Sequence, residues 1–283
     1  GYFLDMVIQA VKVERPMPRP LICVTLRGGT VDEMLKDAAM ATAAGADMVE
    51  VRFDKLWVVE QMPEPEPEEE RDGGTRRPKY VEPDFIPQPL DSVDVQGALE
   101  SLKQGIDLPV VFACRPERQQ GHYPGEEEQR LDILRAAIES GVSWIDLEAD
   151  IDAKARKELM SLAEGKTRVI SSAHFGEEPD SSSEIIQDIE ELEGTGEVLK
   201  VCYITSGRNS GLKLFEAAWM VKESESKISI MGLGPCGDWT RIHAPLLGQD
   251  VVYSTMETGS HLSSQGKINA SDLLIAWEML EYN

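Results

Sequence analysis

Eight short apolar runs alternate with helical patterns along the chain, and this alternation constrains the fold more than any other feature. Strand and helix in strict alternation favour parallel strands joined by helical crossovers. Eight such strands predict an α/β fold closed into a (β/α)8 TIM barrel, formed by a single domain over residues 1–283. The runs, rich in Val and Ile, occupy residues 21–26, 48–53, 109–115, 144–149, 168–173, 198–204, 228–234 and 251–256.

The helical segments between the runs carry start and stop signals. Residues 31–45 open with acidic residues and end at a glycine, as an amphipathic helix does. Residues 126–141, 183–196 and 210–224 repeat this pattern. In residues 271–283 we expect Ser271 to be the N-cap. Four apolar side chains would then share one face of this last helix: Leu273, Leu274, Trp277 and Leu280.

One segment interrupts the alternation. Residues 61–91 are rich in Pro and Glu and have almost no apolar periodicity, so they predict a disordered acidic insertion after the second strand. Composition alone favours a solvated loop without function over an acidic docking segment. The loops that follow barrel strands lie at the active-site face, so the insertion could also form part of a lid.

The composition excludes several functions. A net charge of −23 argues against nucleic acid as a partner. No apolar run approaches the roughly 18 residues needed to cross a membrane, and the first residues carry no recognisable export or transit signal. The histidines and cysteines have no metal-ligand spacing, so we expect no metal site. We expect reduced thiols, buried where they lie in apolar runs, at Cys23, Cys114, Cys202 and Cys236.

The C-terminal ends of the expected strands carry polar side chains, and in a barrel such side chains converge on one site. They are Glu50 and Arg52, Arg115, Asp146 and Glu148, His174, Lys200, Arg241, and Ser263 with Lys267.

Lys200 stands out because apolar residues flank it on both sides. Burial of an ammonium group is costly unless the group is paired or loses its proton. One interpretation is a structural ion pair with a carboxylate of a neighbouring strand, for example Glu50. The other is an amine nucleophile that attacks a carbonyl group.

The arginines and His174 fit the second interpretation. Guanidinium groups are good donors to a carboxylate, so Arg52, Arg115 and Arg241 could hold a small anionic substrate in an otherwise acidic protein. Taken singly, each could equally form a structural ion pair. His174 could act as a general acid and base, or could merely end its strand.

Several of these motifs together resemble the type I 3-dehydroquinate dehydratases, most closely the dehydratase domain of plant bifunctional enzymes. Glu50, Arg52 and Asp54 resemble the Glu-x-Arg-x-Asp signature of that family. VLKVCYI resembles the segment of the Schiff-base lysine, and GDWTRI followed by SSQGKINASDLL resembles the substrate-clamping end. The similarity covers nearly all of the chain except its first residues and residues 61–91.

The resemblance implies a lyase that dehydrates 3-dehydroquinate to 3-dehydroshikimate in the shikimate pathway. Lys200 would form the imine and His174 would transfer the proton, without a cofactor. It implies substrate binding by Glu50, Arg52, Arg115, Gln119, Arg241, Ser263 and Lys267. It also implies a homodimer or fusion to a shikimate dehydrogenase domain, and location in the cytoplasm or the plastid stroma.

Three departures from the family pattern favour an alternative, a weakened domain that binds dehydroquinate, quinate or shikimate in a regulatory role. When the family's strand is aligned without a gap from Ser171, Ala173 takes the place of the family histidine, and His174 falls one residue later. A shift of one residue would point His174 to the opposite face of its strand unless a bulge intervenes. Gln119 replaces a glutamate that orients the histidine, and Lys267 replaces a glutamine of the closing loop. An aldolase-like Schiff-base barrel is a further, less favoured reading.

Overall fold

Eight parallel strands form a nearly closed barrel in the computed structural model, which describes residues 17, 19–64 and 80–282. The predicted fold is confirmed, and each strand lies within three residues of its predicted bounds. The strand order in the sheet is β10-β1-β2-β5-β6-β7-β8-β9. The bounds are β1 Leu21–Thr25, β2 Met48–Arg52, β5 Val110–Ala113, β6 Trp144–Glu148, β7 Arg168–His174, β8 Val198–Ile204, β9 Lys227–Leu233 and β10 Val251–Ser254.

The barrel closes between β9 and β10 through hydrogen bonds outside the regular ladders. The Asp250 backbone N–H donates to the Ile228 carbonyl at 3.1 Å. The Ser229 hydroxyl donates to the Val251 carbonyl at 2.7 Å. A side chain therefore supplies part of the pairing that a continuous ladder would supply elsewhere in the sheet.

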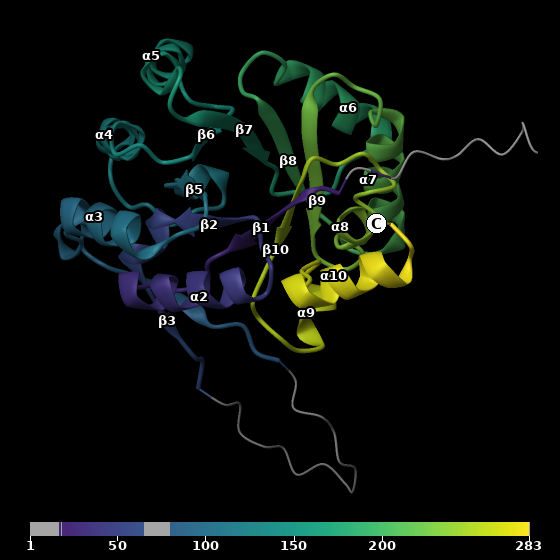
Figure 1. Ribbon diagram of the computed structural model, residues 1–283, viewed down its shortest axis with the longest axis horizontal. Helices are drawn as coiled ribbons and strands as arrows, with labels where there is room; N and C mark the ends of the chain where they lie inside the picture. Colours follow the sequence, from purple (N-terminus) through teal and green to yellow (C-terminus); the bar gives the residue numbers. More distant parts are fainter. Residues whose placement is uncertain (1–16, 18, 65–79, 283) are drawn as a thin grey trace, which may run out of the picture.

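The helices lie outside the sheet and cover it all round (Figure 1). Apolar residues on the outward faces of the strands pack against them; on β8, for example, Leu199 and Val201 join one cluster with Ile185 and Leu214 of the helices. The longer helices are α2 Val31–Ala43, α3 Val95–Gly105, α4 Glu127–Glu139, α5 Ala153–Ala163, α6 Ser182–Glu191, α7 Arg208–Met220 and α10 Ala270–Met279. Short helices are α8 Trp239–Ile242 and α9 His261–Ser264, with 3-10 turns η1 Phe53–Trp57, η2 Leu90–Ser92 and η3 Glu117–Gln119.

The expected cap of the last helix is wrong by two residues. Asn269 is the N-cap of α10, and its side chain accepts a hydrogen bond from the Ser271 backbone N–H at 2.9 Å. Asn and Ser are about equally good N-cap residues, so the residue types alone could not decide which of the two caps the helix. Leu273 and Trp277 are buried as expected, whereas Leu280 is 42% exposed.

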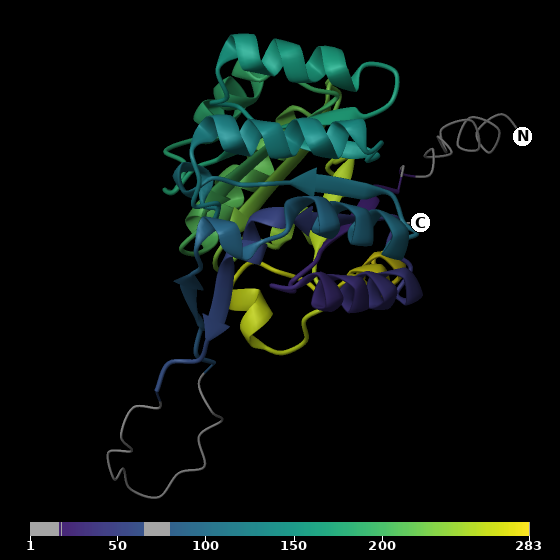
Figure 2. The same ribbon diagram turned by 90° about the vertical axis from the view of Figure 1, so that its left-hand side faces the viewer.

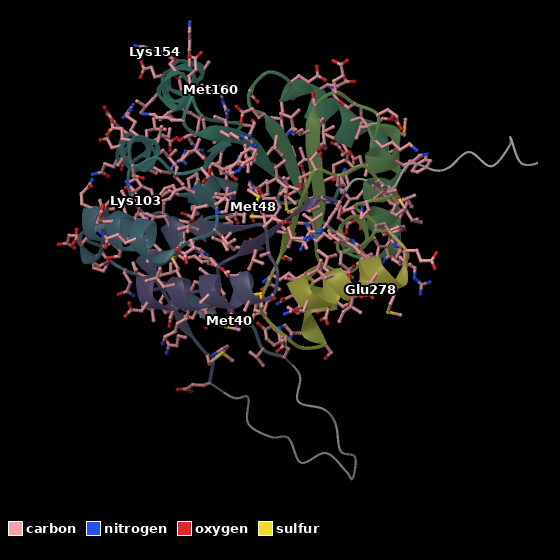
Figure 3. All side chains as sticks on the ribbon, viewed as in Figure 1. Met40, Met48, Lys103, Lys154, Met160 and Glu278 are labelled. Carbon is pink, nitrogen blue, oxygen red and sulfur yellow. The ribbon has the colours of Figure 1, made fainter. Side chains whose placement is uncertain are left out.

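Inward-facing residues of the strands form a separate core inside the barrel. This cluster includes Met48, Ile170, Val198 and Cys202. Figure 3 shows Met48 near the middle of the molecule, while Lys103, Lys154 and Glu278 lie at its periphery. The predicted burial of the thiols in the apolar runs is confirmed: Cys23, Cys114 and Cys202 are buried, Cys236 is half-buried, and none of the four is bridged.

The segment expected to be a disordered insertion differs from that expectation at its ends. β3 Val58–Gln61 and β4 Asp84–Pro87 pair as an antiparallel hairpin, with Val59 opposite Ile86. This hairpin projects from one end of the barrel (Figure 2). Its base is fixed because the Trp57 indole N–H donates to the Leu90 carbonyl at 2.9 Å. The middle of the insertion, residues 65–79, lies outside the described residues.

Within the described part of the chain, no helix is both long and apolar enough to cross a membrane.

Candidate active site

A cavity of about 330 Å³ opens at the C-terminal ends of the strands, where a barrel places its site. Seven of the nine predicted site residues line it: Glu50, Arg52, Arg115, His174, Lys200, Arg241 and Lys267. The other two, Gln119 and Ser263, are not among its lining residues.

Lys200 lies in the middle of β8 with its side chain inside the barrel and only 3% exposed. Its Nζ atom is 3.7 Å from Oε2 of Glu50 on β2 and 4.0 Å from the centre of the Tyr253 ring. Glu50 in turn accepts a hydrogen bond from the Thr25 hydroxyl at 3.0 Å. Glu50 Oε2 has no hydrogen-bond partner among the described residues, so the pair is held by charge rather than by close geometry.

His174 also points into the barrel, and the sequence reading that turned it away is wrong. On β7, Ser172 is the register partner of Lys200, and His174 is the partner of Cys202. Alternate residues of a strand share a face, so Ser172 and His174 face inward with Lys200 and Cys202. Ala173 faces outward and packs in the cluster beneath the helices. No bulge is needed, because the regular alternation of β7 already places both Ser172 and His174 on its inner face.

The surroundings of His174 favour a neutral imidazole. Burial, with the charges of Arg115 and Lys200 adding to it, holds the pKa of His174 well below its ordinary value. Its Nδ1 atom is buried and has no hydrogen-bond partner among the described residues. A neutral imidazole inside a cavity of this kind can accept a proton from a bound ligand.

Gln119 contacts the backbone of His174 rather than its ring. The Gln119 Oε1 atom accepts a hydrogen bond from the His174 N–H at 3.0 Å, while its Nε2 atom donates to Asp150 at 3.0 Å. Gln119 therefore fixes the end of β7. Ser263 lies exposed in α9, away from the cavity, so its predicted substrate contact remains a prediction.

Asp54 holds the side chain of Arg52 in position at the cavity. The guanidinium donates twice to the Asp54 carboxylate, at 2.9 and 2.8 Å. Asp54 also accepts from the backbone N–H groups of Arg115 at 3.1 Å and His122 at 3.0 Å. Burial acts to raise the pKa of Asp54, but Arg52 and these hydrogen bonds outweigh it and hold the pKa well below the ordinary range.

Two buried carboxylates fix the position of the Arg115 side chain. Its Nη2 atom donates to Asp146 at 2.8 Å, and Glu148 lies 3.8 Å from its Nε atom. Burial acts to lower the pKa of Arg115, but Asp146, Glu50 and Glu148 together raise it. Asp146 also accepts from the Ser172 hydroxyl, which ties this network to β7. A cation with both charge and position fixed suits the binding of a polar ligand.

Arg241 differs from these arginines because none of the described carboxylates lies within ion-pairing distance of it. It follows β9 in α8, is 5% exposed, and donates from Nη2 to the Gly232 carbonyl at 3.0 Å. Its Nε atom is buried without a hydrogen-bond partner among those residues. Burial lowers the pKa of Arg241, although a guanidinium stays charged. A buried cation with unused donors is suited to bind an anion.

At the rim, Glu257 holds two cations that line the cavity. Its carboxylate is 3.5 Å from Arg27 Nη1 and 3.5 Å from Lys267 Nζ. Arg27 also pairs with Glu60 of β3 at 3.3 Å. Lys267 thus faces the cavity, as the sequence predicted, but shares a carboxylate with Arg27.

Sequence reasoning missed several lining residues. Lys55 directly follows the Glu-x-Arg-x-Asp signature, so its position after the second strand could have found it. Tyr80, Glu82 and Phe85 lie in the segment taken as disordered, and nothing in its composition signals that they reach the cavity. The Tyr80 ring stacks on His261 of α9 with centres 3.8 Å apart.

Residues 22–283 match the sequence profile of the family described as Type I 3-dehydroquinase. The chain belongs to the type I 3-dehydroquinase family. The match covers the barrel except Leu21, the first residue of β1, and includes every lining residue of the cavity.

Relatives of known name agree with this membership. The chain is 26% identical over 260 residues to the chloroplastic bifunctional 3-dehydroquinate dehydratase/shikimate dehydrogenase of Arabidopsis thaliana, which covers 90% of this chain and 36% of that protein. It therefore spans little more than a third of the plant relative. It is also 26% identical over 253 residues to the 3-dehydroquinate dehydratase of Methanococcoides burtonii, with 88% of this chain and 91% of that protein covered.

Solved structures show the same fold. The 3-dehydroquinate dehydratase of Geobacillus kaustophilus superimposes with a TM-score of 0.72 at 18% identity, over 93% of this chain and 92% of that one. The type I enzyme of Clostridium difficile, solved with covalently modified comenic acid, gives a TM-score of 0.73 at 18% identity, over 94% and 93% of the two chains. At these identities the likeness shows the barrel fold alone.

Proposed function

We propose that this chain dehydrates 3-dehydroquinate to 3-dehydroshikimate through an imine on Lys200, as a step of the shikimate pathway. One observation carries the proposal: Lys200 and His174 project from neighbouring strands into the same cavity, which also holds the buried, unmatched cation Arg241. An amine, a neutral base and an anion-binding group are the parts that this elimination requires. Membership of the type I 3-dehydroquinase family supports the same reaction.

The steps balance with the groups in the cavity. The Lys200 amine adds to the C3 ketone and releases one water to form a protonated imine. His174 removes a proton from C2, and the imine accepts the electron pair as an enamine. The enamine then expels the C1 hydroxyl, which takes the proton from His174 and leaves as water. Hydrolysis of the imine consumes one water and frees Lys200, so the net loss is one water.

The arginines would orient the substrate for these steps. Arg241 has free donors for the substrate carboxylate, and Lys267 can assist from the rim. Glu50 and Arg52 would bind substrate hydroxyls from β2, with Arg115 beside them. Ser263 can reach the substrate only if the loop after β10 moves, because in this structure it is exposed outside the cavity.

A second candidate is a domain that binds the ligand but turns it over slowly. The observation that favours it is that Nδ1 of His174 has no hydrogen-bond partner among the described residues, so none of their carboxylates would stabilise an imidazolium formed during the reaction. Gln119, which contacts the His174 backbone, does not supply that charge.

Turnover separates the two candidates. The purified chain is mixed with 3-dehydroquinate, and the ultraviolet absorbance of the conjugated enone product is followed. We expect turnover that disappears in Lys200→Ala and persists in Lys227→Ala, which removes an exposed lysine at the opposite end of the neighbouring strand β9. Absent turnover in the unaltered chain, with ligand still bound, would establish the second candidate instead.

Association and location rest on the resemblance alone. We propose a homodimer or a fusion to a shikimate dehydrogenase domain, as the Arabidopsis thaliana relative's name describes for that protein, in cytoplasm or plastid stroma. Light scattering on the purified chain tests the dimer; a monomer at micromolar concentration would contradict it.

A further inference from the structure

The cavity concentrates positive charge in a strongly acidic protein. The chain carries a net charge of −23, yet the cavity is lined by more cations than carboxylates. The carboxylates are Glu50, Glu60, Glu82 and Glu257, and the cations are Arg27, Arg52, Lys55, Arg115, Lys200, Arg241 and Lys267. A single substrate carboxylate would neutralise only one of these cations.

Most of the cations already have a carboxylate partner within 4.0 Å. Arg52 pairs with Asp54, Arg115 with Asp146, and Lys200 with Glu50. Arg27 and Lys267 share Glu257 at the rim. Among the described residues, only Arg241 and Lys55 line the cavity without such a partner.

The carboxylate of Asp54, the residue before Lys55, has no lone pair left to accept a hydrogen bond from the Lys55 ammonium group. Asp54 already accepts two hydrogen bonds from Arg52 and one each from the backbone N–H groups of Arg115 and His122. Its lone pairs are therefore used. Burial, then the charge of Arg52, lower the pKa of Lys55 to about 8, and Lys267 adds to this effect. Asp54 and Glu50 oppose this lowering, but among the described residues Lys55 forms no ion pair with either carboxylate.

The two unmatched cations lie on different sides of the cavity. Arg241 follows β9, and Lys55 follows β2 in η1. In the sheet order, β10 and β1 separate these two strands. One carboxylate of a small ligand that reaches Arg241 therefore leaves Lys55 for a second group across the cavity.

We propose that Lys55, assisted by Lys267, forms a second anion-binding subsite opposite Arg241, so that the cavity binds small ligands with two anionic groups more tightly than monocarboxylates. This inference goes beyond the proposed function, whose substrate carries a single carboxylate. The second group can be a carboxylate or a phosphate, since both accept hydrogen bonds from an ammonium group.

Rigid ring carboxylates test the subsite without any turnover. Isothermal titration calorimetry on the full chain compares benzoate with isophthalate and terephthalate, whose two carboxylates differ in spacing. We expect at least one dicarboxylate to bind about tenfold more tightly than benzoate, which corresponds to about 1.4 kcal/mol. Inorganic phosphate, added as a competitor, should weaken the dicarboxylate more than benzoate if the subsite also accepts phosphate; equal weakening would restrict the subsite to carboxylates and overturn that part of the proposal.

Variants assign the preference to a residue. Lys55→Gln should abolish the preference for the dicarboxylate and leave benzoate binding unchanged, whereas Lys55→Arg should retain it. Lys36→Gln, at an exposed lysine of α2, is the matched control. Thermal melting checks that Lys55→Gln is folded, and the loss of an unmatched cation should not destabilise it. Equal binding of all three ligands, or a preference that survives in Lys55→Gln, would overturn the subsite. These ligands cannot be dehydrated, so a failure of the proposed reaction leaves this test intact.

Discussion

The ammonium group of Lys200 faces the carboxylate of Glu50 across the barrel interior, with 3.7 Å between Nζ and Oε2. Both side chains are almost completely buried. Each charge therefore offsets the desolvation cost of the other, because an isolated charge is costly to bury.

This relationship predicts a specific pattern of stability. Lys200→Met should lower the free energy of unfolding by about 3 kcal/mol, since it leaves the Glu50 carboxylate buried without its counter-ion. The double variant Lys200→Met with Glu50→Gln should recover at least half of that loss. Urea denaturation of the two single variants and the double variant measures the coupling. Strictly additive losses would show that the two groups do not depend on each other.

The depressed pKa of His174 predicts the acid limb of the pH–rate profile. A base must be neutral, so kcat/KM should stay constant as the pH falls through 6.5, the ordinary value for histidine, and decline only below it. The same sign applies to stability: the unfolded chain takes up this proton more readily, so stability is lost as the pH falls below about 6.5. The profile of kcat/KM for 3-dehydroquinate checks the first point. An acid limb at or above 6.5 that disappears in a His174 variant would contradict it.

The fold and most of the site were predictable because the barrel links them. Eight β-rich runs fix eight strands, and polar residues at the ends of those strands must then converge. Seven predicted residues do line the cavity for this reason. His174 was predicted as the base of this site, but alignment of the family pattern from Ser171 assigned it to the opposite face. That alignment was wrong by one residue, which is enough to reverse the face of a strand.

Other features depend on contacts that a single sequence does not display. Gln119 turns to the backbone of His174, and this choice between ring and backbone is decided by loop geometry. The strand β4 pairs with β3 inside a segment whose Pro and Glu content indicated disorder. The Phe85 ring of β4 packs at a tilt against the His122 ring, with ring centres 4.7 Å apart, a tertiary contact that overrides the local composition.

We expect Arg241 to contribute to ligand binding but not to the stability of the free protein. Arg241→Gln removes a buried cation that has no described carboxylate partner, so the free energy of unfolding should change by less than about 1 kcal/mol. Affinity for an anionic ligand should fall by roughly 30- to 150-fold, the value of a charge-assisted hydrogen bond of about 2–3 kcal/mol. Denaturation and calorimetry of the same preparation measure both. Arg135→Gln on α4 is the control, and a large loss of stability with unchanged affinity would assign Arg241 a structural role.

Asp54 should matter mainly for stability at neutral pH. Asp54→Asn disrupts the paired hydrogen bonds to Arg52 and should cost about 3 kcal/mol, whereas Asp132→Asn, at an exposed pair with Arg135, should cost less than about 1 kcal/mol. Because the pKa of Asp54 is depressed, its contribution is present above about pH 4 and is lost as the pH falls towards the folded-state pKa. Urea denaturation at several pH values shows this. A difference between the unaltered chain and Asp54→Asn that persists undiminished into strong acid would refute the assignment.

The proposed imine on Lys200 can be tested directly. The chain is incubated with 3-dehydroquinate, reduced with borohydride, digested and analysed by mass spectrometry. We predict a stable adduct on the peptide that contains Lys200, absent when either ligand or borohydride is omitted, and absent in Lys200→Ala. No adduct in the unaltered chain under conditions in which it forms 3-dehydroshikimate, or an adduct on another lysine such as Lys55, would contradict the proposed role of Lys200.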